Sequence, residues 1–477
     1  MPKNVKNSKE NKKLFGTSGI RGKVDGEVTT NLVLNVGKAL ATYLNGEGDV
    51  VLGYDTRTTN KMLENAITAG LLESGCTVLK IGMVPTPLVG YAVEKLDAAA
   101  GIMITASHNP SQYNGIKLWN KNGMAYTPSQ EEEIEGIYYS KDFTEAGWEN
   151  VGDINYIEEI KQEYIDDLLD IVDIKSGLKV VIDSASGAGS ELSPLIFRMA
   201  GCEVITLNSQ IDGFFPGRNP EPNEANLQDL MKVVVANGAD IGIAHDGDAD
   251  RMMAIDENGR IGDFDKLLAI ISKYMAEKSK SSNVKVITTV DAGLCMDESV
   301  SELGGEILRT KVGDVNVAEV IIEESAVFGG EPSGTWLHPD FCMCPDGILS
   351  GLRMAEIISE KGPLSKLLDE IPNYPNIREK INCSKEDKIK VMENMEDLLI
   401  NAFSNIDDMD NMKVFDVNNI DGVRLTFSDG SWVLVRPSGT EDCVRITLEA
   451  KTNDKAEIIR DISSKIIKDN LNKNYSS

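Results

Sequence analysis

The segment Thr105-Ala106-Ser107-His108-Asn109-Pro110 places a hydroxyl group beside an imidazole, directly after an apolar run. The run, residues 98–104, is typical of a buried strand. Ligands in open α/β sheets bind at the ends of such strands. A serine in this position can carry a covalent group if a neighbouring residue activates it. An isolated serine after a strand more often forms a turn or caps a helix.

A second motif, Asp246-Gly247-Asp248-Ala249-Asp250-Arg251, offers three carboxylates at alternate positions. Oxygen ligands of this kind suit a hard cation such as Mg²⁺, although a solvated acidic loop is the plainer interpretation. An EF-hand is disfavoured because Arg251 occupies the sixth position, where the sharp turn needs glycine, even though Glu257 fits the twelfth. A nucleophilic serine together with a cation site indicates phosphoryl transfer.

Two further loops carry polar side chains at glycine turns. Residues 329–334 read Gly-Gly-Glu-Pro-Ser-Gly, and residues 436–441 read Arg-Pro-Ser-Gly-Thr-Glu after an apolar strand. An arginine, two hydroxyls and backbone N–H groups at a glycine turn are typical of a phosphate cradle. Lys117 follows the Ser107 segment closely. We expect the four loops to line a cleft that encloses a small anionic ligand.

The composition excludes several classes of partner. The 48 basic and 76 acidic residues give a net charge of −28, which argues against nucleic acid or an anionic membrane as a partner. No run approaches the ~20 apolar residues of a membrane span. Residues 1–13 lack the apolar region of a signal peptide and predict a flexible tail. We therefore expect a cytoplasmic protein, monomeric or homodimeric, with a small phosphorylated ligand.

The elements that must position these loops follow a recurring order. A strand, a helix and a second strand are expected three times, with the strands at 50–55 and 75–79, 180–183 and 201–205, and 286–291 and 304–308. Alternating strands and helices predict α/β units with largely parallel sheets. Any α/β protein repeats a strand–helix–strand order, but three such repeats suggest three related domains.

The C-terminal part differs from this pattern. Residues 422–427 and 431–435 predict a hairpin, residues 445–450 a strand and residues 455–468 a terminal helix. The expected fold class is therefore three similar α/β domains with mixed, largely parallel sheets plus a smaller C-terminal α+β domain. The expected limits are 14–152 with the Ser107 loop, 153–253 with the acidic loop, 254–366 with the Glu331 loop, and 367–477 with the Arg436 loop.

Together the motifs resemble those of the α-D-phosphohexomutase superfamily, which includes phosphoglucomutase, phosphomannomutase and phosphoglucosamine mutase. The resemblance runs from Phe15-Gly16-Thr17-Ser18-Gly19-Ile20-Arg21-Gly22 to the Arg436 loop, in a mix similar to that of archaeal members. It implies a heart-shaped protein of three similar α/β domains and a smaller fourth. It also implies an enzyme that interconverts hexose 1-phosphate and hexose 6-phosphate through a phosphoserine and a sugar bisphosphate, which would act as intermediate and activator.

The resemblance assigns roles to particular residues. Ser107 would be the phosphoserine, and Mg²⁺ would be bound there by Ser107, Asp246, Asp248 and Asp250. The substrate would be bound by Glu331 and Ser333 at its hydroxyls, and by Arg436, Ser438, Gly439 and Thr440 at its non-reacting phosphate. The groups near the reacting phosphate would be Arg21, His108, Lys117 and Arg251. Lys117 or Arg251 would be the general acid or base, with Lys117 favoured because the pKa of lysine shifts readily; His108 would act directly or support the site.

The sugar stays open at this point. The main interpretation is a mutase of the phosphomannomutase/phosphoglucomutase type, and the alternative is a phosphoglucosamine mutase. Asp314 falls where some bacterial relatives carry histidine, and Pro332 between Glu331 and Ser333 assigns neither branch. The rival classes are a phosphosugar phosphatase, which would direct water at the same intermediate, and a non-catalytic sugar-phosphate binding protein, which would not need Ser107 and three aspartates together.

Overall fold

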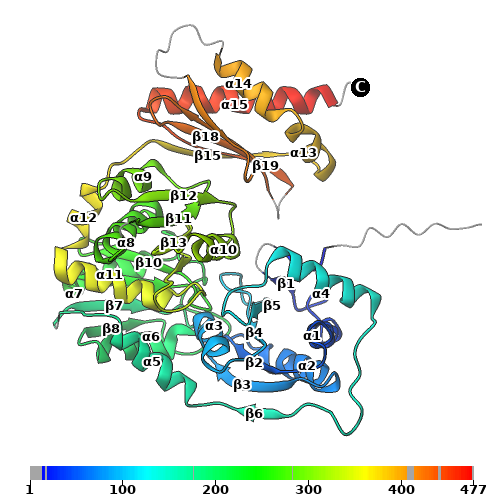
Figure 1. The fold of residues 1–477 in the computed structure, drawn as a ribbon. Helices are drawn as coiled ribbons and strands as arrows, with labels where there is room; N and C mark the ends of the chain where they lie inside the picture. The colour runs from blue at the N-terminus through cyan, green and yellow to red at the C-terminus, as the bar shows by residue number, and fades with distance from the viewer. Residues whose placement is uncertain are drawn as a thin grey trace, which may run out of the picture.

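The computed structural model describes residues 13–16, 19–175, 177–281, 283–404, 413–438 and 442–474. They form four units, each built on its own sheet. The first and second lie at the bottom of Figure 1, the third above the second, and the fourth at the top, with its helices on one side of its sheet. Among these residues no helix is long and apolar enough to cross a membrane.

The first unit has a six-stranded sheet in the order β1-β5-β4-β2-β3-β6. Its strands are β1 (Ile20–Lys23), β2 (Asp49–Tyr54), β3 (Thr77–Met83), β4 (Ala100–Ile104), β5 (Tyr113–Asn120) and β6 (Ile154–Tyr156). Its helices are α1 (Thr30–Tyr43), α2 (Asn60–Glu73), α3 (Thr86–Lys95) and α4 (Pro128–Ser140). Every residue of β4 is buried, which explains its continuous apolar sequence, because helices cover both faces of such a sheet.

The second and third units have four-stranded sheets, ordered β10-β9-β7-β8 and β12-β11-β13-β14. The second unit contains α5 (Ile160–Asp170), β7 (Lys179–Asp183), α6 (Gly189–Met199), β8 (Glu203–Leu207), α7 (Gln228–Asn237), β9 (Ile241–His245) and β10 (Met252–Asp256). The third contains α8 (Phe264–Lys278), β11 (Lys285–Thr289), α9 (Leu294–Ser301), β12 (Glu306–Thr310), α10 (Asp314–Glu324), β13 (Phe328–Gly330), β14 (Trp336–Leu337), α11 (Gly347–Lys361) and α12 (Leu364–Glu370).

The three sheets share one topology, as the recurring pattern predicts. A central strand (β2, β7 or β11) pairs in parallel with the next strand on one side and with a third strand on the other. A fourth strand then pairs antiparallel with the third. The predicted fold of three similar α/β units with mixed, largely parallel sheets is therefore confirmed.

The fourth unit is an antiparallel sheet in the order β15-β19-β18-β17-β16. Its elements are β15 (Asn376–Asn382), α13 (Lys385–Met392), α14 (Met395–Ser404), β16 (Val414–Asn418), β17 (Val423–Phe427), β18 (Trp432–Pro437), β19 (Cys443–Glu449) and α15 (Asn453–Asn474). The predicted hairpin is confirmed, because β17 pairs with β18 and the Phe427 amide donates to the Ser431 carbonyl at 2.8 Å. The edge strands β15 and β16 had no counterpart in the sequence-based expectation.

The main core runs through the first three units without interruption. Helix α11, which follows the third sheet in sequence, packs against β9 and β10 of the second sheet as well as against α8. A helix that seals two sheets at once joins the second and third units into one body. This arrangement holds the loops at the ends of their strands in a fixed relation.

The limit expected at 152 falls before the last strand of the first unit, and the limits at 253 and 366 fall inside the last elements of the second and third units. Strand β6 pairs in parallel with β3 of the first sheet. Strand β10 stays paired with β9 as far as Asp256, and α12 packs against α8 of the third unit. We therefore propose limits after 156, 256 and 371, because pairing with distant partners, which a local pattern does not reveal, decides where each unit ends.

Candidate functional site

The Ser107 loop follows β4 and holds its serine in an unusual backbone conformation. Ser107 is 1% exposed and has φ of 48°, in the left-handed region that residues other than glycine seldom adopt. Its amide donates to Thr105 Oγ1 at 2.8 Å, and that hydroxyl donates to Asp55 Oδ2 at 2.7 Å. The loop is therefore held from behind, and the hydroxyl of Ser107 is left for other partners.

Arg57, which the sequence analysis missed, makes most of the contacts that hold this loop. Its Nη2 donates to the carbonyls of Ser107 at 2.9 Å and Asn109 at 2.6 Å, and its Nη1 to those of Pro110 at 2.7 Å and Tyr113 at 3.0 Å. Its Nε pairs with Asp55 at 3.0 Å. An arginine two residues after a strand-ending aspartate was the available sequence signal.

The acidic loop connects β9 to β10 and meets Ser107. Ser107 Oγ donates to Asp246 Oδ2 at 2.6 Å, across 139 residues of sequence. The two loops also touch through their backbones, since a Cβ on Gly247 would lie 2.5 Å from the Ser107 carbonyl oxygen. The structure therefore brings the first two predicted motifs together, and glycine is needed at 247 for that contact.

The three aspartates of this loop form a pocket of oxygen atoms. Asp246, Asp248 and Asp250 are buried, with carboxylate oxygens within 4.8 Å of one another. In each, Oδ2 is hydrogen-bonded, whereas Oδ1 is buried without a partner among the described residues. Burial raises the pKa of Asp246 well above its usual range, and its two neighbours raise it further. Three unpartnered carboxylate oxygens that repel one another fit a divalent cation.

Lys117 on β5 lies against the same carboxylates. Its Nζ donates to Asp248 at 2.8 Å and to Asp250 at 2.5 Å. Thr86, at the start of α3, donates to the same oxygen of Asp248 at 2.7 Å. Burial alone would lower the pKa of Lys117, but the two carboxylates outweigh it and raise the pKa. The side chain is therefore a positively charged partner of the acidic loop.

His108 lies beside Ser107, and Arg251 and Arg21 lie near His108. His108 Nδ1 lies 3.2 Å from Ser107 Oγ, and burial, together with Arg251 and Arg21, lowers its pKa to about 2, so its ring is neutral at pH 7. Arg251 Nη1 lies 3.6 Å from Glu221, and Arg21 Nη1 donates to Asn109 at 3.4 Å. Of these three predicted residues, His108 contacts the Ser107 hydroxyl, and Arg21 reaches the same loop at Asn109.

The Glu331 loop connects β13 to β14 and lies against the acidic loop. The Met252 amide donates to the Gly334 carbonyl at 3.1 Å. Glu331 accepts from the Gly313 amide at 2.7 Å, and Ser333 Oγ lies 3.5 Å from its other oxygen. Burial raises the pKa of Glu331 to about 7, helped by Asp314. Glu331 and Ser333 therefore lie side by side next to the acidic loop, and their binding of sugar hydroxyls stays a prediction.

The Arg436 loop follows β18, and its Gly439 and Thr440 lie outside the described residues. Arg436 pairs with Asp421 at 2.7 Å, and the same oxygen accepts from the Val312 amide of the third unit at 3.3 Å. Lys388 donates to the Ser438 carbonyl at 2.6 Å. On the neighbouring strand β19, Arg445 stands opposite Arg436. The sequence analysis missed Lys388 and Arg445, which add positive charge to this loop.

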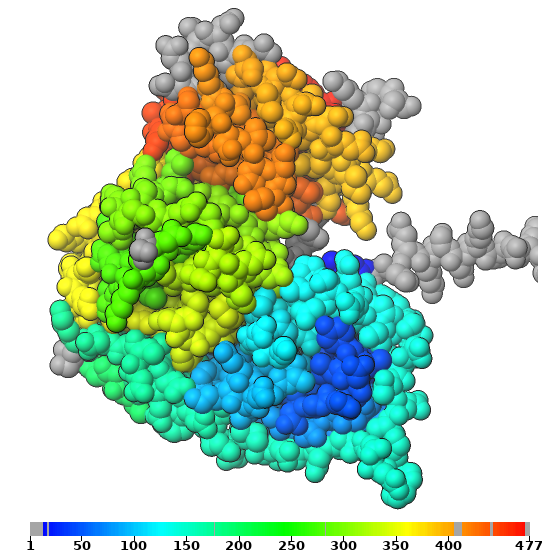
Figure 2. Space-filling model, in the orientation of Figure 1, coloured from blue at the N-terminus to red at the C-terminus, as the bar shows by residue number. Residues whose placement is uncertain are grey.

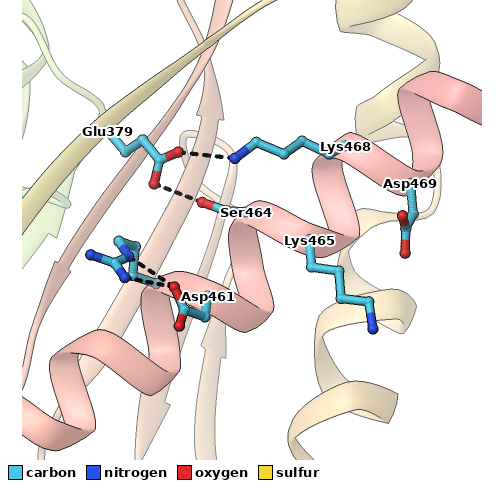
Figure 3. A pocket seen from close by; sticks show the side chains of 7 residues that line it. Glu379, Asp461, Ser464, Lys465, Lys468 and Asp469 are labelled. Atoms are coloured by element: carbon cyan, nitrogen blue, oxygen red, sulfur yellow. Dashed lines mark hydrogen bonds and ion pairs between the residues drawn. The ribbon is translucent and has the colours of Figure 1, made fainter.

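Two hollows lie near this site. A cavity of about 180 Å³ between the first and third units is lined in part by Lys117, Glu131 and Asp314, so Asp314 lies at the cleft. Figure 2 shows the surface hollowed between the fourth unit and the first. A larger groove along α15 (Figure 3) lies away from the four loops, and some of its side chains pair with one another, as Glu379 does with Ser464 at 2.7 Å and with Lys468 at 3.5 Å.

His245 and His338 are buried residues whose contacts hold loops in place. His245 shares hydrogen bonds with Ser193 at 2.8 Å and with the Arg251 carbonyl at 3.1 Å, and burial lowers its pKa to about 4. His338 shares a hydrogen bond with Ser350 at 3.0 Å. Both rings are fully buried and brace the ends of strands.

Comparison with known proteins agrees with this arrangement. Four domain models described as phosphoglucomutase/phosphomannomutase match in order: alpha/beta/alpha domain I at residues 12–145, domain II at 156–259, domain III at 263–374, and the C-terminal domain at 381–463. Together they cover most of the chain and all four loops.

Relatives match the chain almost end to end. A probable phosphoglucosamine mutase of Methanobrevibacter smithii is 69% identical over 460 residues, 96% of this chain and 99% of that protein. A phosphoglucosamine mutase of Methanococcus maripaludis is 48% identical over 97% of this chain and 100% of that protein. The crystal structure of a phosphoglucomutase/phosphomannomutase family protein from Burkholderia thailandensis superposes with a TM-score of 0.84 at 26% identity, covering 96% of this chain and 97% of that one. The chain therefore belongs to the phosphoglucomutase/phosphomannomutase family and is a phosphohexomutase, an isomerase that moves a phosphoryl group within a sugar phosphate.

Proposed function

We propose that this protein is a phosphoglucosamine mutase, which interconverts glucosamine 6-phosphate and glucosamine 1-phosphate. The relatives that match along nearly the whole chain carry that name. They favour the alternative of the sequence analysis over its main interpretation, a phosphomannomutase/phosphoglucomutase. The observation that carries the chemistry is the contact of 2.6 Å between the Ser107 hydroxyl and Asp246 of the acidic loop.

The proposed reaction has two phosphoryl transfers. The phosphate ester of Ser107 gives its phosphoryl group to the free hydroxyl of the sugar monophosphate: the bond from phosphorus to Ser107 Oγ breaks and a bond to the sugar oxygen forms. The proton that the sugar hydroxyl loses is passed to Ser107 Oγ, so that the transfer leaves no proton over. The resulting glucosamine 1,6-bisphosphate turns over in the cleft, and its other phosphoryl group returns to Ser107 by the reverse steps. Such transfers depend on positioning and charge stabilisation.

The proton transfers need a neutral group near Ser107. His108 is neutral at pH 7 and lies 3.2 Å from the hydroxyl, so we assign it the relay of this proton: one ring nitrogen accepts the proton from the sugar hydroxyl while Nδ1 donates its own to Ser107 Oγ. Lys117 is held as an ammonium by two carboxylates, which suits charge stabilisation or proton donation rather than proton abstraction. Arg251 and Arg21 would stabilise the charge of the transferring phosphoryl group.

The acidic loop would bind Mg²⁺ through Asp246, Asp248 and Asp250, each by its unpartnered oxygen. When bound, the ion would neutralise charge on the phosphoryl group. At the other end of the cleft, Arg436 and Ser438, with Gly439 and Thr440, would hold the non-reacting phosphate. Glu331 and Ser333 would bind the sugar hydroxyls, and the pair is already assembled beside the acidic loop.

The substrate assignment is tested by comparing sugars. The protein is primed with a hexose 1,6-bisphosphate in Mg²⁺ and then given glucosamine 6-phosphate, glucose 6-phosphate or mannose 6-phosphate, while ³¹P NMR follows the 1-phosphates and free phosphate. We expect the highest kcat/KM for glucosamine 6-phosphate and no release of phosphate. A higher kcat/KM for mannose 6-phosphate or glucose 6-phosphate would instead support a phosphomannomutase/phosphoglucomutase. Free phosphate released in stoichiometric amounts would indicate a phosphatase.

A further inference from the structure

Two buried arginines hold the two loops that meet at Ser107. The first is Arg57, whose five contacts with Asp55 and the Ser107 loop are described above. The second is Arg218, whose Nε pairs with Asp183 at 2.9 Å and whose Nη2 donates to the carbonyl of His245 at 2.6 Å. His245 directly precedes Asp246, so Arg218 holds the start of the acidic loop.

The two arginine–aspartate pairs occupy the same place in the shared topology. Asp55 directly follows the central strand β2, and Asp183 ends the equivalent strand β7. Each aspartate accepts from the amide two residues later at 2.9 Å, that of Arg57 or Ala185. Arg57 then reaches past the neighbouring parallel strand β4 to carbonyls of the loop that follows it, and Arg218 reaches the carbonyl of His245, the last residue of the parallel strand β9.

The pairs are alike in space but not in sequence. Arg57 is two residues from its aspartate, whereas Arg218 is 35 residues from Asp183. The two are also linked, because Arg57 lies over the ring of Phe215, 5.0 Å from its centre, in the segment that leads to Arg218. In the third unit, Thr288 instead donates to the Gly330 carbonyl, at 2.8 Å.

We propose that Arg57 and Arg218 are positioning residues with separate tasks: Arg57 sets Ser107 for phosphoryl transfer, and Arg218 sets the acidic loop for metal binding. Neither guanidinium is aimed at substrate, since its nitrogens are used on backbone carbonyls and an aspartate. Arg57 fixes the backbone that keeps Ser107 in its left-handed conformation. Arg218 fixes the residue before Asp246. The proposal rests on the mutase function above, but its metal half does not depend on the sugar.

The test compares Arg57→Lys and Arg218→Lys, which keep the charge but cannot reach several carbonyls at once. Arg353→Lys is the matched control, because Arg353 is equally buried and pairs with Glu356 at 3.0 Å and Asp340 at 2.7 Å, on α11 away from the four loops. For each protein, calorimetry gives the Kd for Mg²⁺ alone, intact mass gives the rate of Ser107 phosphorylation by glucose 1,6-bisphosphate, and turnover gives kcat and KM.

Arg57→Lys should lower the phosphorylation rate and kcat about 100-fold, the scale of a small misplacement of a reacting group, with KM and the Kd for Mg²⁺ unchanged. Arg218→Lys should raise that Kd roughly 10- to 100-fold, with turnover restored at saturating Mg²⁺. Arg353→Lys should change none of these values. The proposal is overturned if Arg57→Lys is as active as the control, or if Arg57→Lys and Arg218→Lys weaken the binding of Mg²⁺ equally.

A milder variant covers the case in which Arg57→Lys does not fold. Thr105→Val removes the hydroxyl that accepts from the Ser107 amide and donates to Asp55, so it should lower kcat without changing the Kd for Mg²⁺; an unchanged kcat would overturn the assignment of Arg57. If the parent protein is not phosphorylated at Ser107, the mutase function fails. The comparison of Arg218→Lys with Arg353→Lys still decides the metal half.

Discussion

In the first unit, the connection from β4 to β5 carries a hydroxyl and a neutral imidazole. In the second unit the equivalent connection, from β9 to β10, carries three buried carboxylates, and in the third unit it carries Glu331 and Ser333. The order of the four core strands is the same in all three sheets, and the first sheet adds β1 and β6 at its edges. Shared topology therefore brings the same edge of each sheet to one place, while the residues of each connection decide its chemistry.

The first two units also differ in the residues that hold each loop in place. Asp55 and Asp183 occupy matching positions, yet their arginines come from different distances along the chain. Lys117 of the first unit adds positive charge beside the second unit's carboxylates. The two units are complementary halves of one site, and each can be disabled separately.

Removing Ser107, the proposed nucleophile of the first unit, should have the largest effect. Ser107→Ala should lower turnover on the order of 10⁴-fold or more, the scale seen when a nucleophile is deleted, and should remove the phosphorylated species seen by intact mass. Ser111→Ala, in the same loop, is the control and should keep full activity. Substantial turnover by Ser107→Ala would mean that the first unit does not carry the covalent step.

Disabling the second unit should be nearly as severe but should depend on the metal. Asp248→Asn removes one anionic ligand and the partner of Lys117 and Thr86, so turnover should fall roughly 100-fold or more, the cost of losing a group that stabilises developing charge. Activity should also vanish in EDTA and return with Mg²⁺. Asp229→Asn, on an exposed helix of the same unit, should behave like the parent. Full activity in EDTA would make the acidic loop a solvated loop.

A change in the fourth unit should have a moderate effect on both half-reactions. Arg436→Ala should cost roughly 1.5–3 kcal/mol in kcat/KM, the value of a charge-assisted hydrogen bond, for the 1-phosphate and the 6-phosphate alike. Arg436 pairs with Asp421, which also contacts the third unit. Because Arg436 would hold the substrate's phosphate, substrate should draw the fourth unit toward the others less in Arg436→Ala than in the parent, and small-angle scattering should show a smaller decrease in the radius of gyration. Loss confined to one direction would argue that the loop holds only one end of the sugar.

The smallest effect should come from the third unit and should appear in stability. The pKa of Glu331 is raised to about 7, so the folded protein binds this proton more tightly than the unfolded chain. The tighter binding of this proton therefore stabilises the folded protein below pH 4.5, and this stabilisation is lost as the pH rises to about 7. Glu331→Gln should flatten the fall in the free energy of unfolding between pH 5 and 8, measured with urea. Glu323→Gln, on α10 of the same unit, should leave the slope unchanged; an equal slope in both variants would contradict the assignment.

Local sequence was enough for several features of this protein. The apolar run at 98–104 predicts β4 because both faces of that strand are buried, and the Ser-Asp-Gly turn predicts the β17–β18 hairpin. Residue types in the four loops indicate a nucleophile, a metal site, a sugar site and a phosphate cradle. These features depend on residues that are close together in the sequence, because the periodicity of a strand and the residue types of a turn each involve only a few consecutive positions.

Only the tertiary structure decided which distant residues meet. It places β6 on the first sheet, α11 against the second, and Arg57 and Arg218 behind the loops that carry the chemistry. It also makes Lys117 a charged partner of Asp248 and Asp250 rather than the lysine of lowered pKa that its residue type suggested. Such contacts join residues far apart in sequence, and burial together with neighbouring charge, not residue type, sets their protonation.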